Sequence, residues 1–336
     1  MRRGALLQML VIALVAAGGG VALALAVPWL PYSAGHEADR IDFVFWFVVG
    51  ICIFIFAIVS SMLVYSVIHF RARPDDDSDG PPIHGHTGLE IAWTALPTVL
   101  VTAIGVVSAV VLARNGNAGA HPMRVDVTAQ QFAWSFSYPE AKGMQTNVLR
   151  LPVGRSVQLT FTAKDVIHSF WVPQFGQKQD AVPGLHPTLH ITPKRTGTFP
   201  VICTELCGLG HALMRTVVIV MPTAQFRRWL SGQTKTATTG GGAKLGATVF
   251  KNNGCAACHT FKPAGAAGKV GPDLDQLPQE AKRAGKPLAE FTRESIVNPS
   301  AYVEKGYPDN VMPKTFKSLP KQQLDALVQY LTAKKG

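Results

Sequence analysis

One segment of this chain gathers side chains that bind redox-active metals. The sequence CTELCGLGHALM places Cys203, Cys207, His211 and Met214 within twelve residues, and His168 lies upstream in the stretch HSFW. Soft thiolate, thioether and imidazole ligands in such a cluster favour copper. One cysteine with two histidines and a weakly bound methionine would complete a mononuclear blue copper site. The second cysteine also allows the two thiolates to bridge a pair of copper ions, with one histidine on each ion.

A bridged pair of copper ions suits an electron relay, because one electron shared over two metal ions lowers the reorganisation on a change of redox state. Met214 and a backbone carbonyl would then fill the weak ligand positions. Two other interpretations stay open for Cys203 and Cys207, namely a disulfide bond and a structural zinc site.

A second segment, CAACH, predicts a covalently attached c-type haem. Cys255 and Cys258 would bind the haem covalently, and His259 would bind its iron. Within residues 243–336, His259 is the only histidine and Met312 the only methionine. A histidine and methionine pair is the ligation that raises a haem potential for electron transfer. The alternatives are a disulfide for the two cysteines and a metal-free core position for the methionine.

Three apolar segments predict attachment to a membrane. Residues 5–30, 43–70 and 91–113 are each long enough to cross a hydrocarbon core of about 30 Å, which takes roughly 20 helical residues. The first is either a signal peptide or a first membrane helix, since two arginines precede an apolar run that ends in small residues. The other two predict a transmembrane helical hairpin. The basic residues that begin its loop indicate that the loop is cytoplasmic, and the remainder of the chain then lies on the outer, periplasmic face.

Length and composition predict a chain of several domains. The chain has 336 residues, of which 47% are apolar and 16% charged, and this balance excludes a single soluble globule. The net charge of +11 does not indicate nucleic acid binding, because the domains that follow the membrane segments are predicted to lie on the outer face, away from nucleic acid. The excess of positive charge could attract anionic lipid headgroups. The predicted parts are residues 1–30 (signal peptide or first helix), 31–115 (transmembrane hairpin), 120–230 (all-β sandwich), 231–243 (flexible linker) and 244–336 (all-α domain).

These motifs strongly resemble subunit II of the haem-copper cytochrome c oxidases over about residues 40–230, and class I cytochromes c after the linker. The resemblance implies a Greek-key cupredoxin domain that holds the binuclear copper A centre, followed by a fused cytochrome c domain. It implies that Glu205 binds copper through its backbone carbonyl and, through its carboxylate, a magnesium ion shared with subunit I. The implied copper ligands are His168, Cys203, Glu205, Cys207, His211 and Met214.

The same resemblance assigns roles to other positions. Lys178 and Asp180, in the loop KQDAVPG, are expected beside the magnesium site, although such a pair in a turn is commonly only solvated. Glu90, in LEIAWTALP, matches a glutamate at the mouth of a proton pathway into subunit I. A glutamate near the N-terminus of a helix is also explained by the helix dipole alone.

The predicted cytochrome domain carries further matches. Pro272, in GPDL, is expected to orient His259 through its carbonyl, and the helix with Gly246 and Phe250 is expected to cross the final helix near Tyr330.

One departure from the family concerns how electrons arrive. Many members carry the cluster QWYWSY, whose first tryptophan faces an external cytochrome c. This chain has QFAWSF, so Phe132 occupies that position and Trp134 is retained. These two residues are the candidates for electron uptake, and the tethered haem domain is the expected substitute for an external cytochrome.

The resulting hypothesis is the electron-input subunit of a terminal cytochrome c oxidase in a bacterial inner membrane. Electrons would pass from a reduced cytochrome or a quinol-oxidising complex to haem c, then to copper A and subunit I, where oxygen is reduced to water with proton translocation. No residue of this chain would be catalytic. The alternatives are the copper A subunit of a nitric oxide reductase, and a non-enzymatic electron shuttle or copper-delivery protein. A copper carrier would expose its methionines and histidines, and Glu90 argues against a pure shuttle.

Overall fold

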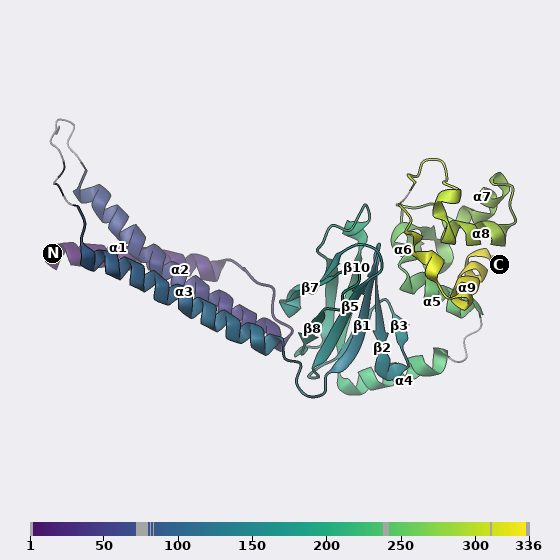
Figure 1. The fold of residues 1–336 in the computed structure, drawn as a ribbon, viewed down its shortest axis with the longest axis horizontal. Helices are drawn as coiled ribbons and strands as arrows, with labels where there is room; N and C mark the ends of the chain where they lie inside the picture. The colour runs from purple at the N-terminus through teal and green to yellow at the C-terminus, as the bar shows by residue number, and fades with distance from the viewer. Residues whose placement is uncertain are drawn as a thin grey trace. The chain divides into compact units, whose positions relative to one another are not determined.

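The chain is described from a computed structural model, which covers residues 3–71, 80, 82, 84–237, 242–309 and 311–333. It divides into two units (Figure 1). The first consists of Met1–Tyr32 and Asp39–Asn115, and the second of Ser33–Ala38 and Gly116–Gly336.

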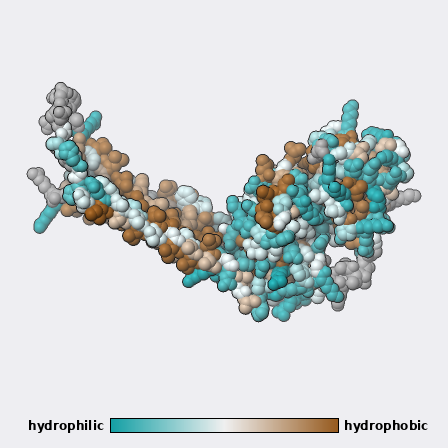
Figure 2. All heavy atoms as spheres, viewed as in Figure 1, coloured by the Kyte–Doolittle hydropathy of each residue, from teal (hydrophilic) through white to brown (hydrophobic). Residues whose placement is uncertain are grey.

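The first unit contains long apolar helices. Among the described residues, three helices are long and apolar enough to cross a membrane: α1 (Arg3–Ala26), α2 (His36–His69) and α3 (Thr87–Asn115). Figure 2 shows apolar side chains covering their outer faces, and the leucines, valines and phenylalanines on them are largely exposed. Apolar surface on this scale is typical of helices that contact lipid or another membrane subunit.

The predicted helical hairpin is described as two separate helices, because residues 72–79, which would join α2 to α3, lie outside the described residues. The Nη1 of Arg40, near the start of α2, donates a hydrogen bond to the Oδ1 of Asn115 at the end of α3, at 3.0 Å. The Ser61 hydroxyl of α2 donates to the Met9 carbonyl of α1 at 2.6 Å. Whether α1 is removed as a signal peptide stays a prediction.

The predicted β-sandwich is confirmed in the second unit. Two five-stranded sheets have the orders β3-β2-β1-β5-β8 and β4-β10-β9-β6-β7. Side chains alternate along each strand, so that in β5 Val157, Leu159, Phe161 and Ala163 are buried while the residues between them are not. The strands are β1 (Met123–Gln130), β2 (Ala133–Tyr138), β3 (Met144–Thr146), β4 (Leu149–Pro152), β5 (Val157–Ala163), β6 (His168–Trp171), β7 (Lys178–Ala181), β8 (Thr188–Ile191), β9 (Gly197–Cys203) and β10 (Arg215–Met221).

Short elements complete the sandwich. The 3-10 helices η1 (Pro139–Ala141), η2 (Pro173–Phe175) and η3 (His211–Leu213) lie in its loops. The segment Ser33–Ala38 also pairs with it: the Ala34 amide donates to the Gln174 carbonyl at 2.8 Å, and the Glu37 carboxylate accepts from the Thr192 amide at 2.8 Å.

Helix α4 (Thr223–Ala237) differs from the prediction of a flexible linker that begins at residue 231. Phe226 and Trp229 anchor its first turns, since the Trp229 ring lies 5.4 Å from Tyr138 and 5.0 Å from the Arg150 guanidinium. A helix fixed by packing at one end extends readily through the polar residues that follow. The rest of the predicted linker, residues 238–241, lies outside the described residues.

The last part of the chain is helical, as predicted. Helices α5 and α9 cross at Gly246, where a Cβ atom would lie 2.1 Å from the Ala326 carbonyl oxygen. Phe250 and Tyr330 pack edge to face at 6.0 Å, which confirms the expected crossing. The elements are α5 (Gly242–Asn252), α6 (Cys255–Cys258), β11 (Thr260–Phe261), η4 (Lys262–Ala264), β12 (Ala266–Ala267), η5 (Leu274–Gln276), α7 (Leu277–Arg283), α8 (Leu288–Val297), η6 (Pro299–Ala301), η7 (Lys314–Ser318) and α9 (Lys321–Thr332).

Candidate functional site

The second sheet brings the predicted copper ligands to one end of the sandwich. Strand β6 begins at His168 and runs antiparallel to β9, which ends at Cys203. The Cys203 amide donates to the Met214 carbonyl at 3.2 Å, immediately before β10. The loop between β9 and β10 therefore returns to its starting point and carries Cys207 and His211 with it.

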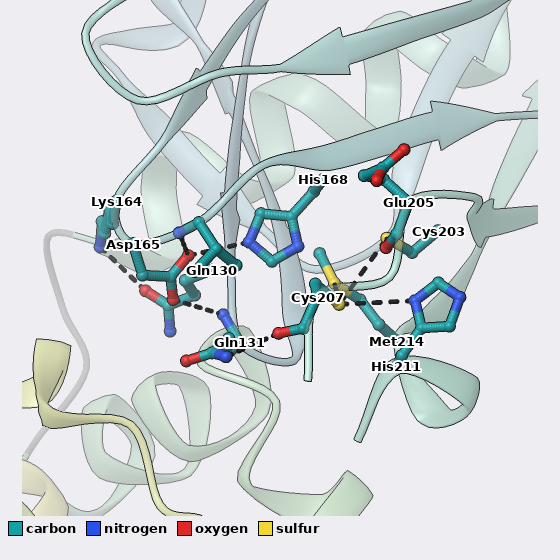
Figure 3. A network of polar contacts seen from close by, with 11 residues as sticks. Gln130, Gln131, Lys164, Asp165, His168, Cys203, Glu205, Cys207, His211 and Met214 are labelled. Carbon is teal, nitrogen blue, oxygen red and sulfur yellow. Dashed lines mark hydrogen bonds and ion pairs between the residues drawn. The ribbon is translucent and has the colours of Figure 1, made fainter. Parts of the chain in front are cut away.

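The ligand atoms of this cluster lie within reach of a small metal centre (Figure 3). The Sγ atom of Cys207 lies 3.9 Å from the Sγ of Cys203, 3.5 Å from the Nδ1 of His211 and 3.8 Å from the Sδ of Met214. The ligand atoms of His168, Cys203 and Cys207 all lie within 4.8 Å of one another. The Cys203 Sγ is also 3.3 Å from the Glu205 carbonyl. All six residues predicted as copper ligands are thus brought together.

The His168 ring is oriented as a metal ligand would be. Its side chain is fully buried, and its Nε2 forms a hydrogen bond with the Asp165 carboxylate at 2.8 Å. Its Nδ1 is buried without a hydrogen-bond partner. A histidine that binds a metal typically donates its other ring N–H to a carboxylate or carbonyl. The unpartnered nitrogen therefore fits a copper ion, and the two thiols beside it fit the softness of that metal.

A cavity in the helical part fits a haem. Cys255, Cys258, His259 and Met312 all line it. The His259 Nδ1 lies 2.8 Å from the Pro272 carbonyl, to which it can donate, and this hydrogen bond leaves Nε2 for the iron. Burial lowers the pKa of His259, so the ring stays neutral, as a ligand must be. Most of the remaining wall is apolar and includes Phe250, Leu277, Phe291, Ile296, Leu327 and Leu331.

All five cysteines lie in the described part of the chain, and none of them forms a disulfide. The disulfide interpretation of both cysteine pairs is therefore wrong in this structure.

Three families match the chain. They are "Cytochrome C oxidase subunit II, transmembrane domain" over residues 24–111, "Cytochrome C oxidase subunit II, periplasmic domain" over residues 143–221, and "Cytochrome c" over residues 243–334. Cytochrome c oxidase subunit 2 of Synechocystis sp. is 34% identical over 256 residues, which cover 62% of this chain and 77% of that protein. The subunit 2 of Alkalihalophilus pseudofirmus is 29% identical over 289 residues, which cover 83% of this chain and 82% of that protein.

The chain belongs to the cytochrome c oxidase subunit 2 family. Membership implies copper A in its periplasmic domain and haem in its cytochrome c domain. It also implies a haem-copper oxidase complex with a subunit I, and the apolar helices suggest an anchor in a membrane.

The two thiols of this subunit differ in their proton affinity. Burial raises the pKa of Cys203, but the neighbouring His168 ring and the backbone of Ser169 and Glu205 outweigh this effect and lower the pKa below its usual value. Burial and the neighbouring Cys203 raise the pKa of Cys207. The Cys207 thiol is therefore the one that a bound metal would have to deprotonate against a raised pKa.

Both predicted electron-uptake residues of this subunit lie beside the copper ligands. Phe132 packs against the loop between β9 and β10 (residues 204–214), which we call the ligand loop. A Cβ atom on Gly210 of this loop would lie 2.4 Å from the Phe132 ring. Trp134 is buried edge to face against His168, with ring centroids 6.2 Å apart. Phe132 and Gln131 also line the haem cavity, which belongs to the same unit.

The remaining predicted roles concern Glu90, the strand β7 that pairs with β6, and the Glu205 side chain. Glu90 is in the first turn of α3, where its Oε1 accepts a hydrogen bond from the His86 amide at 3.2 Å, as a helix-capping residue would. Lys178 and Asp180 lie on the edge strand β7, and the Lys178 Nζ is 5.8 Å from the centroid of the Trp171 ring. The Glu205 side chain is exposed.

Sequence reasoning missed three polar residues at the two centres. Asp165 could have been found, because a carboxylate three residues before a ligand histidine is a recognisable signal. Gln131 is the first residue of the motif QFAWSF, but nothing in the sequence linked it to Cys207 or Asp165, and Glu280 gave no signal. Glu280 lines the haem cavity almost fully buried; its carboxylate accepts a hydrogen bond from the Tyr302 hydroxyl at 2.8 Å and another from Arg283.

Proposed function

We propose that this subunit receives electrons at haem c, transfers them to the copper A pair and delivers them to the haem-copper site of subunit I. Oxygen is reduced to water there, and protons are translocated. The observation that supports this proposal is that the candidate copper ligands lie together and the candidate haem ligands line one cavity, both in the same unit of the chain.

The copper set is assigned from the geometry around Cys207. Cys203, Cys207, His168 and His211 would hold the two copper ions. Met214 and the Glu205 carbonyl complete the coordination. Bound copper supplies a one-electron relay. The chain's contribution is to hold soft ligands in a buried, rigid frame, which keeps the site nearly unchanged when an electron arrives or leaves.

The haem set is assigned in the same way. Cys255 and Cys258 attach the haem, His259 and Met312 bind its iron, and the Pro272 carbonyl fixes the plane of the histidine ring. Methionine ligation and the apolar wall favour a high potential suited to electron transfer. The haem serves as electron carrier when bound.

Phe132 and Gln131 are proposed as the contact between the two centres. Phe132 packs against the ligand loop at Gly210 and also lines the haem cavity, so it connects the two ligand sets. Trp134 packs edge to face against His168 and so supports that ring. An external donor then reaches the haem rather than the copper domain, in accordance with the phenylalanine at position 132.

Further assignments extend the proposal to the complex. The Glu205 carboxylate binds magnesium at the boundary with subunit I, and Lys178 and Asp180 lie beside that site. Glu90 opens a proton pathway into subunit I, in addition to its capping of α3. The donor is a cytochrome or a quinol-oxidising complex, and the chain crosses the bacterial inner membrane more than once, in contact with lipid. We keep the domain boundaries predicted from the sequence, except that helix α4 extends the copper domain through residue 237.

The test uses the oxidase complex purified from membranes. With an artificial reductant, we expect oxygen consumption, a haem c spectrum and near-infrared copper bands. Nitric oxide offered as an alternative acceptor should not replace oxygen. Turnover of nitric oxide without oxygen consumption would instead identify a reductase, and the absence of both turnovers from a complex with intact spectra would indicate an electron shuttle.

A further inference from the structure

We propose that Gln131 is a positioning residue of the copper centre, which joins the loop that carries Cys207 to the loop that carries His168. This inference rests on the proposed copper function and adds a residue that lies outside the ligand set. Gln131 is the residue that follows β1, at the end of the sandwich where the ligands gather (Figure 3).

Two hydrogen bonds from Gln131 reach the two ligand loops. Its side-chain Nε2 donates to the Cys207 carbonyl at 2.6 Å. Its backbone amide donates to the Oδ2 of Asp165 at 2.7 Å, and the Oδ1 of Asp165 holds the Nε2 of His168 at 2.8 Å. One residue thus contacts the backbone carbonyl of Cys207 through its side chain and, through its main chain, the aspartate that holds His168. These two ligands are otherwise 39 positions apart in the sequence.

The ligand loop is shaped to receive this side chain. Gly208 has a φ of 130°, and a Cβ atom there would lie 2.8 Å from the Gln131 Nε2. A side chain at position 208 would therefore strain the backbone, and it would also displace the side-chain amide of Gln131. Gly210 makes the equivalent space for the neighbouring Phe132 ring. Both glycines of the loop lie where residues 131 and 132 pack.

A glutamine suits this position chemically. The Cys207 carbonyl needs a donor, and the amide supplies one without adding a charge beside two thiolates. A glutamate could not donate, and a lysine would place a positive charge near the metal ions. A fixed carbonyl holds the Cys207 backbone in place, so that the sulfur stays between its partners when the charge of the copper pair changes.

The preceding residue provides a matched control. Gln130 is also buried, but its Oε1 accepts a hydrogen bond from the Lys164 ammonium at 3.1 Å, and its Nε2 has no hydrogen-bond partner. Gln130→Met and Gln131→Met remove the same group from neighbouring positions. They therefore separate a general effect of losing a buried amide from the specific effect of losing the contact with Cys207.

The experiment measures copper in the intact oxidase complex carrying each variant. For Gln131→Met, we expect copper loss to a chelator to be about tenfold faster, in the range seen when outer partners of metal ligands are removed. The hyperfine pattern of the mixed-valence copper signal should change as well, and the haem spectrum should not. Gln130→Met should match the wild type within about twofold.

A second variant keeps the inference testable if Gln131→Met fails to assemble. Gly208→Ala leaves Gln131 in place but occupies the space of its amide, so it should also accelerate copper loss and alter the signal. Copper retention and signals equal to the wild type in either assembled variant, or equal effects of Gln130→Met and Gln131→Met, would overturn the inference. Absence of the mixed-valence signal from the wild-type complex would instead overturn the proposed copper function.

Discussion

The copper and haem centres of this subunit differ in what holds their ligands in place. At the copper centre, ligands and their outer partners contact one another directly: Cys207 lies between Cys203, His211 and Met214, and Asp165 holds His168. At the haem centre, the two cysteines, the histidine and the methionine line a mainly apolar cavity, and the hydrogen bond between His259 and Pro272 fixes one ligand.

This difference separates what each cofactor contributes to the fold. The residues proposed as copper ligands lie on and between strands that are joined by backbone hydrogen bonds, so we expect the frame of the site to persist when copper is lost. The haem cavity is bounded by side chains that form the core of its domain, so a bound haem would be part of that core. Loss of haem should therefore destabilise the fold of the cytochrome domain. Loss of copper should instead abolish electron transfer and leave the fold of the copper domain in place.

The largest expected effect comes from removing haem attachment. In the double variant Cys255→Ala with Cys258→Ala, we expect loss of the covalent haem and unfolding of the cytochrome domain, because its cavity would be left open. Haem staining and limited proteolysis of the complex measure both effects. The mixed-valence copper signal should persist. If the cytochrome domain of the variant resists protease as well as the wild-type domain does, haem does not support the fold of its domain and the contrast between the two centres is wrong.

Substitution of a bridging thiol should affect chemistry more than structure. Cys207→Ser should abolish the mixed-valence copper signal and oxygen consumption, while the haem spectrum and the thermal unfolding of the cytochrome domain stay unchanged. Cys52→Ser, at an exposed cysteine of α2, is the matched control and should behave as the wild type. Loss of haem in Cys207→Ser would show that the two centres depend on each other for folding.

Copper uptake should depend on pH where haem retention does not. Burial and the neighbouring Cys203 raise the pKa of Cys207, so the metal-free thiol is protonated near neutral pH and must release a proton when copper binds. The apparent affinity should therefore fall as the pH falls, by about tenfold per pH unit for each proton released. Competition with a chelator between pH 8 and pH 6, on metal-depleted complex, measures this slope. An affinity independent of pH would contradict the assignment.

The smallest expected effect concerns Glu280. A buried carboxylate beside the haem favours the oxidised, more positive iron, so Glu280→Gln should raise the haem potential. We expect less than a tenfold change in the one-electron equilibrium, or under about 59 mV, because Arg283 and Tyr302 already contact the carboxylate. Redox titration measures the shift, and Glu290→Gln, at an exposed position of α8, is the control. An unchanged or lower potential in Glu280→Gln would contradict the expectation.

The sequence predicts the metal ligands better than it predicts the residues that position them. Five of the six residues at the copper centre lie within one short segment, so their types and spacing were sufficient to expect a metal. Gln131 meets Asp165 across 34 positions and Cys207 across 76, and only the folded sandwich brings these residues together. The extension of α4 was missed for a related reason: contacts of Phe226 and Trp229 with the sandwich outweigh the polar composition of residues 231–237.

The crossing of α5 and α9 has a consequence at the level of the gene. Every missense change in a glycine codon introduces a Cβ, and at Gly246 that atom would overlap the Ala326 carbonyl and the Tyr330 side chain. Codon 246 is therefore open only to synonymous change, whereas the codons of the exposed lysines on the same domain can drift. Among variant copies of the gene, codon 246 should show synonymous substitutions and no amino-acid substitutions.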